Sequence, residues 1–252
     1  MTLNVNGIRS AISKGLLEYL DAEKPDVVCF QEIKALEEQI PVLEFQIRGY
    51  ESFWFPAQKK GYSGTAILSK ATPLKVHRGM DIPKYDYEGR FIRIDYQDLS
   101  VVSVYHPSGS SGDERQAFKM QWLADFHEYI RKLRNECPKL VISGDYNICH
   151  KAIDIHDPVR NKTVSGFLPE EREWMDQFFN DGFVDTFRHL NKNPDNYTWW
   201  SFRANAKQKN LGWRIDYNVI TENMKSDISK VWIDPSVNFS DHCPAFLELG
   251  IE

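Results

Sequence analysis

Short apolar runs rich in β-branched residues recur along the whole chain, and each is bounded by Gly, Pro, Asn or Asp. Runs of this composition form strands, whereas the bounding residues form turns. The pattern predicts a chain of many short strands, which must bury their apolar faces against each other or against helices. The predicted strands are Leu3–Val5, Val27–Gln31, Ser52–Phe55, Thr65–Leu68, Phe91–Asp95, Val101–Tyr105, Leu140–Ser143, Tyr197–Trp199, Ile215–Ile220, Lys230–Ile233 and Ala245–Leu249.

Helices are fewer, and the clearest is predicted from about Asp113 to Glu136. The apolar residues that recur there at spacings of three and four are Phe118, Trp122, Phe126, Ile130 and Leu133. This is the period of a helix with one buried face. Ser111 followed by Glu114 fits a capping box at its start. A second helix is predicted over about Glu170–Asn180, and a third between Ile12 and Leu20.

The length and composition fit one domain, residues 1–252, of packed sheets flanked by helices. A chain of 252 residues with 42% hydrophobic residues can bury one large core. No window of about 18 apolar residues predicts a membrane span, and the N-terminus lacks the pattern of a signal peptide. Four scattered cysteines without a C-x-x-C pair fit a reducing compartment. We therefore expect a cytoplasmic protein without membrane association, located at the nucleoid if the source is bacterial.

Amides and acids gather where the predicted strands end. The clusters are Asn4 to Gly7, Gln31 with Glu32, Gly144 to Asn147, Arg214 to Tyr217, and Ser240 to His242. Strand ends at one edge of a sheet collect ligand sites, because a rigid scaffold can aim several side chains at one point. Each cluster alone also fits an ordinary turn, in which Asp and Asn bond their own backbone. Five clusters at strand ends together favour a functional site.

Most of these clusters offer oxygen donors. Carboxylates completed by amides and waters suit Mg²⁺ or Mn²⁺, whereas zinc would call for His and Cys at closer spacing. We interpret His150 and His156, which are six residues apart, as loop histidines rather than zinc ligands. His242 could donate or accept a proton near neutral pH, with its tautomer fixed by a carboxylate such as Asp216. The residues alone also allow an ordinary surface histidine at position 242.

Eight ordered motifs carry a resemblance over essentially the whole chain. They are LNVNGIR from Leu3, QEIK from Gln31, GYSG from Gly61, EGR from Glu88, GDYN from Gly144, GFLPEER from Gly166, GWRIDY from Gly212 and SDHCP from Ser240. With these motifs the chain resembles the exonuclease III family of abasic endonucleases, within the wider endonuclease/exonuclease/phosphatase superfamily. The motifs from Gly166 and Gly212 point to the DNA-repair branch.

The resemblance implies a four-layer α/β sandwich, with two β-sheets face to face, helices outside and the site at one end. It implies a divalent-metal-dependent phosphodiesterase of DNA repair that uses Mg²⁺ or Mn²⁺. The implied reaction is hydrolysis 5′ to an abasic site, leaving a 3′-hydroxyl, with 3′-to-5′ exonuclease and 3′-end trimming activity. The expected substrate is double-stranded DNA with abasic sites or damaged 3′ ends, and we expect a monomer.

The same resemblance implies roles for individual residues. The implied metal ligands are Asn6, Glu32, Asp145, Asn147, Asp241 and His242. The implied catalytic residues are Tyr105, Asp145, Asn147, Asp216, Asp241 and His242. The implied substrate contacts are Arg9, Lys34, Tyr62, Arg90, Trp199, Arg203, Trp213 and Ile215.

Within these sets, Asp145 would bind or deprotonate the attacking water, and Asn147 and His242 would contact the scissile phosphate. Asp216 would orient His242. Tyr105 would donate to the phosphate, and Asp241 would assist a metal or the leaving oxygen.

The matching aromatic positions imply a pocket for the sugar of a flipped-out abasic nucleotide. Trp199, Trp213 and Ile215 would form its apolar wall, which admits a bare deoxyribose and rejects a nucleotide that still carries its base. The alternative is that these tryptophans are ordinary core residues, since Trp is highly buried on average.

Two other functions compete with a repair nuclease. A phosphatase or phosphodiesterase for inositol phosphates or lipids would share the metal and His242 but lack a surface for DNA. The net charge of −5 gives no global sign of a polyanion partner, so a DNA surface must be a local basic patch. The residues available for it are Arg9, Lys34, Lys59, Lys60, Arg90, Arg203, Lys207, Lys209 and Arg214, with Trp199, Trp200 and Trp213 to pack a sugar. A non-enzymatic DNA-binding protein would show gaps in the catalytic set, and the chain has none.

Overall fold

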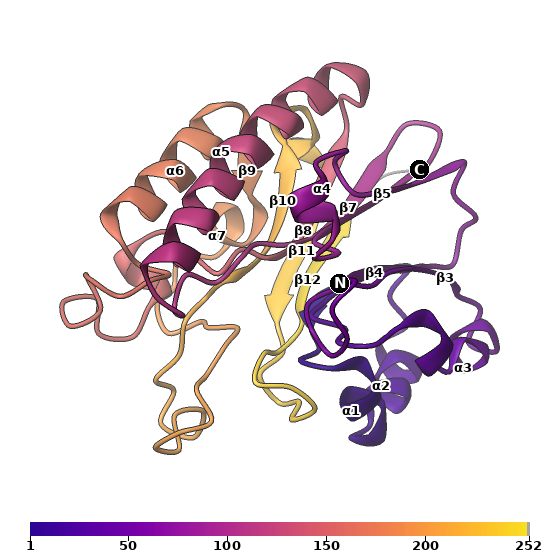
Figure 1. The fold of residues 1–252 in the computed structure, drawn as a ribbon, viewed down its shortest axis with the longest axis horizontal. Helices are drawn as coiled ribbons and strands as arrows, with labels where there is room; N and C mark the ends of the chain where they lie inside the picture. The colour runs from indigo at the N-terminus through magenta and orange to yellow at the C-terminus, as the bar shows by residue number, and fades with distance from the viewer. Residues whose placement is uncertain (251–252) are drawn as a thin grey trace.

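The computed structural model describes residues 1–250 and contains two mixed β-sheets of six strands each (Figure 1). The strand order is β11-β12-β1-β2-β4-β3 in the first sheet and β5-β6-β7-β8-β10-β9 in the second. Pairs β1–β2 and β7–β8 are parallel, and the other pairs are antiparallel. The strands are β1 (Thr2–Asn4), β2 (Val27–Gln31), β3 (Glu51–Phe55), β4 (Thr65–Ser69), β5 (Lys75–Arg78), β6 (Phe91–Asp95), β7 (Ser100–Tyr105), β8 (Leu140–Asp145), β9 (Phe183–Asp185), β10 (Asp216–Thr221), β11 (Ile228–Ile233) and β12 (Ala245–Leu249).

The two sheets pack face to face, and helices cover their outer faces (Figure 1). Cys29, Ile67 and Val141 belong to the apolar layer between the sheets. The helices are α1 (Ile8–Ser13), α2 (Leu16–Glu23), α3 (Val42–Gln46), α4 (Pro83–Asp86), α5 (Asp113–Glu136), α6 (Pro169–Asn180) and α7 (Thr186–Leu190), with 3₁₀ turns η1 (Glu37–Gln39), η2 (Ala152–Asp154) and η3 (Glu222–Asp227). Helices α1 and α2 pack on the first sheet, and α5 and α6 on the second. This arrangement confirms the predicted four-layer α/β class.

The strand predictions were wrong in three places. Tyr197–Trp199 is not a strand, because Trp199 makes only isolated bridges to Trp213 and His242. Strands β5 and β9 were not predicted. The sequence KVHR of β5 alternates little and is largely exposed, and β9 has only three residues, so neither carries a strong apolar pattern.

The helix predictions were correct for α5 and α6 but not for the first helix. The segment between Ile12 and Leu20 divides into α1 and α2 at Gly15, whose φ of 103° is a left-handed conformation that favours glycine. The predicted capping box at α5 is also wrong. Gly112 precedes the first helical residue, and no side chain caps the helix there.

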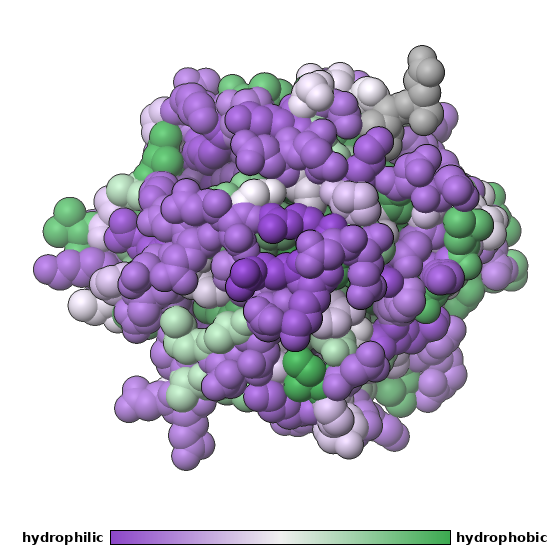
Figure 2. Space-filling view, turned by 90° about the horizontal axis from the view of Figure 1, so that it is seen from above, coloured by the Kyte–Doolittle hydropathy of each residue, from purple (hydrophilic) through white to green (hydrophobic). Residues whose placement is uncertain are grey.

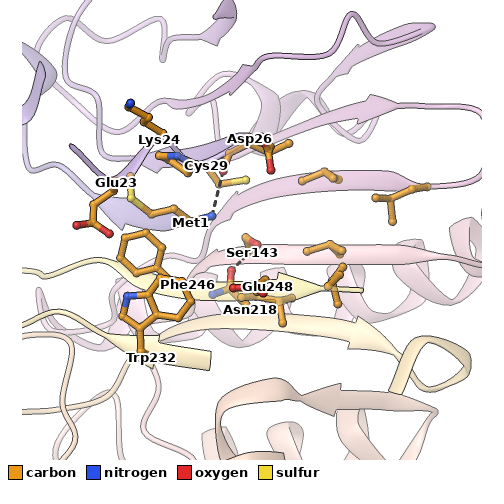
Figure 3. A pocket seen from close by; sticks show the side chains of 17 residues that line it. Met1, Glu23, Lys24, Asp26, Cys29, Ser143, Asn218, Trp232, Phe246 and Glu248 are labelled. Carbon is orange, nitrogen blue, oxygen red and sulfur yellow. Dashed lines mark hydrogen bonds between the residues drawn. The ribbon is translucent and has the colours of Figure 1, made fainter. Parts of the chain in front are cut away.

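Strand direction places the polar clusters at one end of the sandwich. Strands β1, β2, β7 and β8 end there, and β10 and β12 begin there, so their flanking residues meet across the two sheets. At the opposite end, a cavity of about 450 Å³ opens between the sheets beside Met1, Cys29 and Trp232 (Figure 3). None of the helices within residues 1–250 is long and apolar enough to cross a membrane.

Candidate active site

A cavity of about 290 Å³ lies at the end of the sandwich where the polar clusters meet. One side of it is polar and the other is aromatic. The polar lining residues are Asn4, Glu32, Tyr105, Ser108, Ser110, Asp145, Asn147, Ser165, Asp241 and His242, and the remaining lining residues are Val164, Gly166, Trp199, Trp213 and Ile215.

The two sheets are joined at this cavity by the side chain of Asn4. Its amide nitrogen donates to Glu32 Oε2 at 3.0 Å and to Asp145 Oδ2 at 2.8 Å. Glu32 follows β2 in the first sheet, and Asp145 ends β8 in the second, so two carboxylates converge on one point. Three oxygen-bearing side chains from different strands therefore share the polar wall.

The prediction that Asn6 lies with Glu32 and Asp145 in this polar group was wrong. Asn6 does not line the cavity, and Asn4 stands where Asn6 was expected. The Asn6 amide donates to Asp241 Oδ1 at 2.9 Å and accepts from Lys34 Nζ at 2.6 Å. Both asparagines belong to the same motif, and nothing in the sequence shows that Asn4 faces the cavity whereas Asn6 does not.

Three of the strand-end residues adopt the left-handed conformation. The φ angles are 45° for Asn6, 55° for Glu32 and 51° for Asn147. This conformation is unfavourable for residues other than glycine, and it persists only where the surrounding structure holds the residue in place. For Asn147, the backbone N–H donates to Asp145 Oδ1 at 2.8 Å and the side-chain amide donates to His106 O at 2.9 Å. The turn after β8 is thus fixed by the Asp145 carboxylate and by the backbone oxygen of His106.

His242 and Asp216 form a buried pair. His242 Nδ1 lies 2.8 Å from Asp216 Oδ2, and His242 Nε2 lies 3.9 Å from Asp145 Oδ2. Burial alone lowers the pKa of His242, but the charge of Asp216 and its hydrogen bond raise it to about 10. The imidazole is therefore protonated at neutral pH and presents a charged N–H to the cavity through Nε2.

Asp145 and Tyr105 also have shifted pKa values. Burial, followed by the charge of Asp216, raises the pKa of Asp145 to about 7. Burial and the nearby charges of Glu32 and Asp145 raise the pKa of Tyr105 well above its usual range. Tyr105 therefore keeps its proton and can donate a hydrogen bond, whereas Asp145 is poised to exchange one.

Asp241 is held by two donors on the aromatic side of the cavity. Its Oδ1 accepts from Asn6, and its Oδ2 accepts from Trp199 Nε1 at 3.0 Å. Burial opposes ionisation of Asp241, but His242 and these two hydrogen bonds lower its pKa. The carboxylate is therefore ionised, and it links the polar wall to Trp199.

The polar wall has the donor chemistry of a divalent-cation site. Ligand atoms of Asp145, Asp216 and His242 lie within 4.8 Å of one another. Among the described residues, Asp216 Oδ1 is buried without a hydrogen-bond partner, which leaves one acceptor for a cation or a water. Because His242 is protonated and bonded to Asp216, the better oxygen set is the carboxylates of Glu32 and Asp145, which suit a hard cation, and the Asn4 amide nitrogen orients both of them.

The aromatic wall brings together the three residues expected to form a sugar pocket. Trp199 and Trp213 pack edge to face with ring centroids 5.8 Å apart, and Ile215 lies in the same cluster. Both tryptophans are half-buried and line the cavity. Trp200 differs from them, because it is buried in the core of the first sheet and bonds Asn210.

Only some of the residues predicted to form a basic surface are exposed in the structure. Arg9 and Arg203 are exposed, as are Lys59, Lys60 and Lys209. Arg90 and Arg214 are not surface residues, so the expectation that they face DNA was wrong. Arg214 is fully buried and pairs with Asp154 and Asp185.

Arg90 supports the site from behind. It is 2% exposed, pairs with Glu88, and donates to the backbone oxygen of Tyr105 at 2.9 Å and to Tyr62 at 3.1 Å. Lys34 is partly exposed and pairs with Glu32 at 2.8 Å. Tyr62 and Lys34 do not line the cavity.

Two histidines outside the cavity behave as expected for loop residues. His150 bonds Asp176 at 2.7 Å, and His156 is exposed. The cavity residues that were not predicted as site residues are Asn4, Ser108, Ser110, Val164, Ser165 and Gly166. Small and polar loop residues carry no pattern that separates them from ordinary turn residues.

Known proteins match this chain over nearly its full length. Residues 1–242 match the model of the Endonuclease/Exonuclease/phosphatase family. An exodeoxyribonuclease from Bacillus subtilis is 40% identical over 250 residues, which cover 98% of each chain. The structure of an AP endonuclease from Archaeoglobus fulgidus superposes with a TM-score of 0.92 at 30% identity, covering 99% of this chain and 98% of that one.

One of the similar solved structures contains bound DNA. The 3′ phosphatase NExo from Neisseria, bound to a product DNA hairpin, has a TM-score of 0.91 and 28% identity over 98% of this chain and 97% of that chain. Together with the cavity at the strand ends, the full-length matches show that this chain belongs to the Endonuclease/Exonuclease/phosphatase family.

Proposed function

We propose that this protein is a divalent-metal-dependent DNA-repair nuclease that hydrolyses the phosphodiester 5′ to an abasic site and leaves a 3′-hydroxyl. The observation that carries the proposal is the cavity itself, which sets the Glu32, Asp145 and His242 groups opposite the aromatic wall. The similarity to an AP endonuclease and to a 3′ phosphatase bound to DNA supports DNA as substrate. The same site would trim 3′ ends and remove 3′ nucleotides.

Glu32 and Asp145 are the residues that would hold the cation, which we propose to be Mg²⁺ or Mn²⁺, and Asn4 would orient both carboxylates. When bound, it would supply positive charge to the phosphoryl oxygens. Lys34 contacts Glu32 and adds a second positive charge there. Asp241 stands beside this group, and its ionised carboxylate, which has no proton to give, would assist the leaving oxygen only indirectly, through the cation or the charged His242 ring.

The other polar residues would act on the phosphate and the water. Protonated His242 would donate from Nε2 to a phosphoryl oxygen, while Asp216 holds its ring. Asn147 and the neutral Tyr105 hydroxyl would donate to the same group. Asp145 would accept the proton of the attacking water, a role that a pKa near 7 suits.

The aromatic wall would select the nucleotide. A flipped-out nucleotide loses its stacking, and this cost is least where no base is present. A cavity of about 290 Å³ lined by Trp199, Trp213 and Ile215 has an apolar face for the bare sugar. The exposed Arg9 and Arg203 would contact the DNA backbone.

We also propose a monomer with a single catalytic domain that works in the reducing cytoplasm. Both sheets contribute residues to the one cavity, which supports a single domain. The face seen in Figure 2 is mostly hydrophilic, with only small separate hydrophobic areas, whereas permanent interfaces bury extended apolar patches. All four cysteines are free thiols.

Incision of a duplex that holds one tetrahydrofuran abasic analogue tests the proposed function. Cutting 5′ to the analogue should require Mg²⁺ or Mn²⁺ and stop with EDTA. An undamaged duplex with a recessed 3′ end and an inositol phosphate serve as competing substrates. Hydrolysis of the inositol phosphate alone would replace the nuclease by a small-molecule phosphatase.

A further inference from the structure

Behind the cavity lies a buried ion pair that the proposed reaction does not use. Lys119 on α5 and Glu171 on α6 are both 0% exposed, and Lys119 Nζ lies 2.6 Å from Glu171 Oε1. Neither residue lines the cavity. A buried ion pair of this kind costs desolvation energy, which makes it a poor source of stability and raises the question of what it positions.

Lys119 holds one wall of the cavity through the backbone of Asn147. Its ammonium donates to Asn147 O at 2.9 Å. Asn147 is the residue with φ of 51°, a conformation that its surroundings must maintain. The ammonium therefore fixes the peptide that aims the Asn147 amide into the cavity.

Glu171 holds a second wall, the Ser165–Gly166 turn. Its Oε2 accepts the backbone N–H of Gly166 at 2.7 Å and that of Leu168 at 3.0 Å. Gln116 from α5 joins this network, because it donates to Glu171 and accepts from Ser165. One carboxylate thus fixes the backbone of the turn at two successive points.

The Ser165–Gly166 turn packs directly against Trp213 of the aromatic wall. A Cβ added at Gly166 would lie 2.8 Å from Trp213 Cζ3 and 3.1 Å from Asn147 O. The φ of Gly166 is also 97°, so glycine is required both by conformation and by space. A small shift of this turn would move Trp213 relative to Asn147.

We infer that Lys119 and Glu171 form a positioning pair that sets the distance between Asn147 and the Gly166–Trp213 wall, and thereby controls which nucleotide fits the cavity. The inference rests on the proposed function, since it assigns to the pair the selectivity for a bare sugar. Misplacement of a substrate by about 1 Å can cost on the order of 10²-fold in rate, so loosening this wall should act on turnover and selectivity.

A double variant tests the pair without leaving a lone buried charge. Lys119→Met with Glu171→Gln removes both charges at nearly constant size, so that Asn147 O loses its donor and the Gly166 and Leu168 amides bond a neutral oxygen in place of a carboxylate. The matched control is Arg93→Met with Asp95→Asn, which neutralises a largely buried ion pair on β6 outside the cavity. Lys119→Arg, which keeps the charge, should retain most of the wild-type selectivity.

Two measurements are made on each variant. The first is kcat/KM on the tetrahydrofuran duplex divided by kcat/KM for excision at an undamaged recessed 3′ end. We expect this ratio to fall at least ~10-fold in the double variant, mainly through kcat, and to stay within about 2-fold in the control. The second is amide hydrogen exchange at Gly166 and Leu168, which should accelerate on the order of 10-fold only in the double variant.

The outcomes separate the inference from the proposed function. Faster exchange with an unchanged selectivity ratio would overturn the inference, because the pair would then be only structural. Unchanged exchange would also overturn it, since the pair would not hold the turn. Absence of abasic incision by the wild-type protein would overturn the proposed function. The exchange data would still decide whether the pair positions the turn.

Discussion

At the scale of single residues, the pair of Asp216 and His242 makes a direct prediction about ionisation. Asp216→Asn removes the main charge that raises the pKa of His242 to about 10, whereas burial continues to lower it. The pKa should therefore fall, so that the imidazole loses its proton at a lower pH. NMR titration of the His242 ring measures the pKa. We expect kcat to fall less than in His242→Ala, which should lose at least ~10²-fold, because Asp216→Asn disturbs His242 only indirectly.

Asp176→Asn provides a matched control for that titration. It removes a carboxylate that lies 2.7 Å from another histidine, His150, outside the cavity. Activity should remain within about 2-fold of wild type, since no cavity residue is changed. A His242 pKa that stayed near 10 in Asp216→Asn would show that other charges set it.

Trp199 makes a second prediction, because it is both an apolar wall and a donor to Asp241. Trp199→Phe keeps a ring but loses the N–H···Oδ2 hydrogen bond of 3.0 Å. We expect kcat to fall about 3- to 10-fold, the value of one hydrogen bond, with the preference for abasic DNA preserved. Trp199→Ala and Trp213→Ala should instead shift the preference toward undamaged 3′ ends.

The control for Trp199→Phe is Trp200→Phe, which makes the same change in the core and loses a bond to Asn210. Kinetics on both substrates measure these effects. If the two alanine variants lost activity on abasic DNA and on undamaged 3′ ends equally, Trp199 and Trp213 would have a purely structural role.

Glu32 gives a third prediction, on the cation. Glu32→Gln replaces a carboxylate by a neutral amide, which binds a hard dication less tightly. The Mg²⁺ concentration for half-maximal activity should rise on the order of 10-fold or more, with partial recovery by Mn²⁺. Glu37→Gln, an exposed residue of η1, is the control. A metal titration identical to that of wild type would remove Glu32 from the cation site.

At the scale of secondary-structure elements, His106 joins β7 to α5 and predicts how stability depends on pH. Its Nδ1 accepts from Trp122 Nε1 at 3.0 Å, and its ring stacks on Tyr146. Burial, together with the charges of Lys119 and Arg90, lowers its pKa well below 6.5. The unfolded chain binds a proton below pH 6.5 that the folded chain excludes, so stability should fall as pH decreases below that value.

The size of this effect follows from the linkage relation. Between pH 8 and pH 5, exclusion of one proton costs at most about 2 kcal/mol, since each pH unit below 6.5 contributes up to about 1.4 kcal/mol. Urea unfolding at pH 8 and pH 5 measures it. His106→Gln lacks the titrating group and should lose less stability than wild type over this range. An equal loss in both proteins would assign acid sensitivity to other groups.

At the scale of the whole molecule, the acidic chain is predicted to bind DNA through a local basic surface. Net charge is −5, yet Arg9, Arg203 and Lys209 are exposed. Each phosphate contact contributes about −0.9 to the slope of log affinity against log salt. Arg203→Glu or Lys209→Glu should therefore flatten this slope by about 1, as measured by fluorescence anisotropy.

Two charge reversals define the limits of that surface. Lys132→Glu, on the exposed side of α5 and paired with Glu128, should leave the slope unchanged. Arg90→Glu should destabilise the fold instead, because it would bury a negative charge beside Glu88. Binding that did not depend on salt would contradict a DNA-phosphate surface altogether.

The sequence by itself determined most of the elements and most of the members of the site. Strands such as β2 and β8, and the helix α5, follow from local apolar periodicity, which depends only on neighbouring residues. Glu32, Asp145 and His242 were predicted because they belong to motifs at strand ends. The structure indeed places them around one cavity.

Only the tertiary structure decided which neighbour faces the cavity and which charge is buried. Asn4 and Asn6 share one motif, but the end of β1 and packing against β8 direct Asn4 between two carboxylates. Arginine is usually a surface residue, and only the contacts of Arg90 with Glu88 and Tyr105 show that it is internal. Side-chain direction after a strand and the burial of a charge depend on residues distant in sequence, so local pattern cannot fix them.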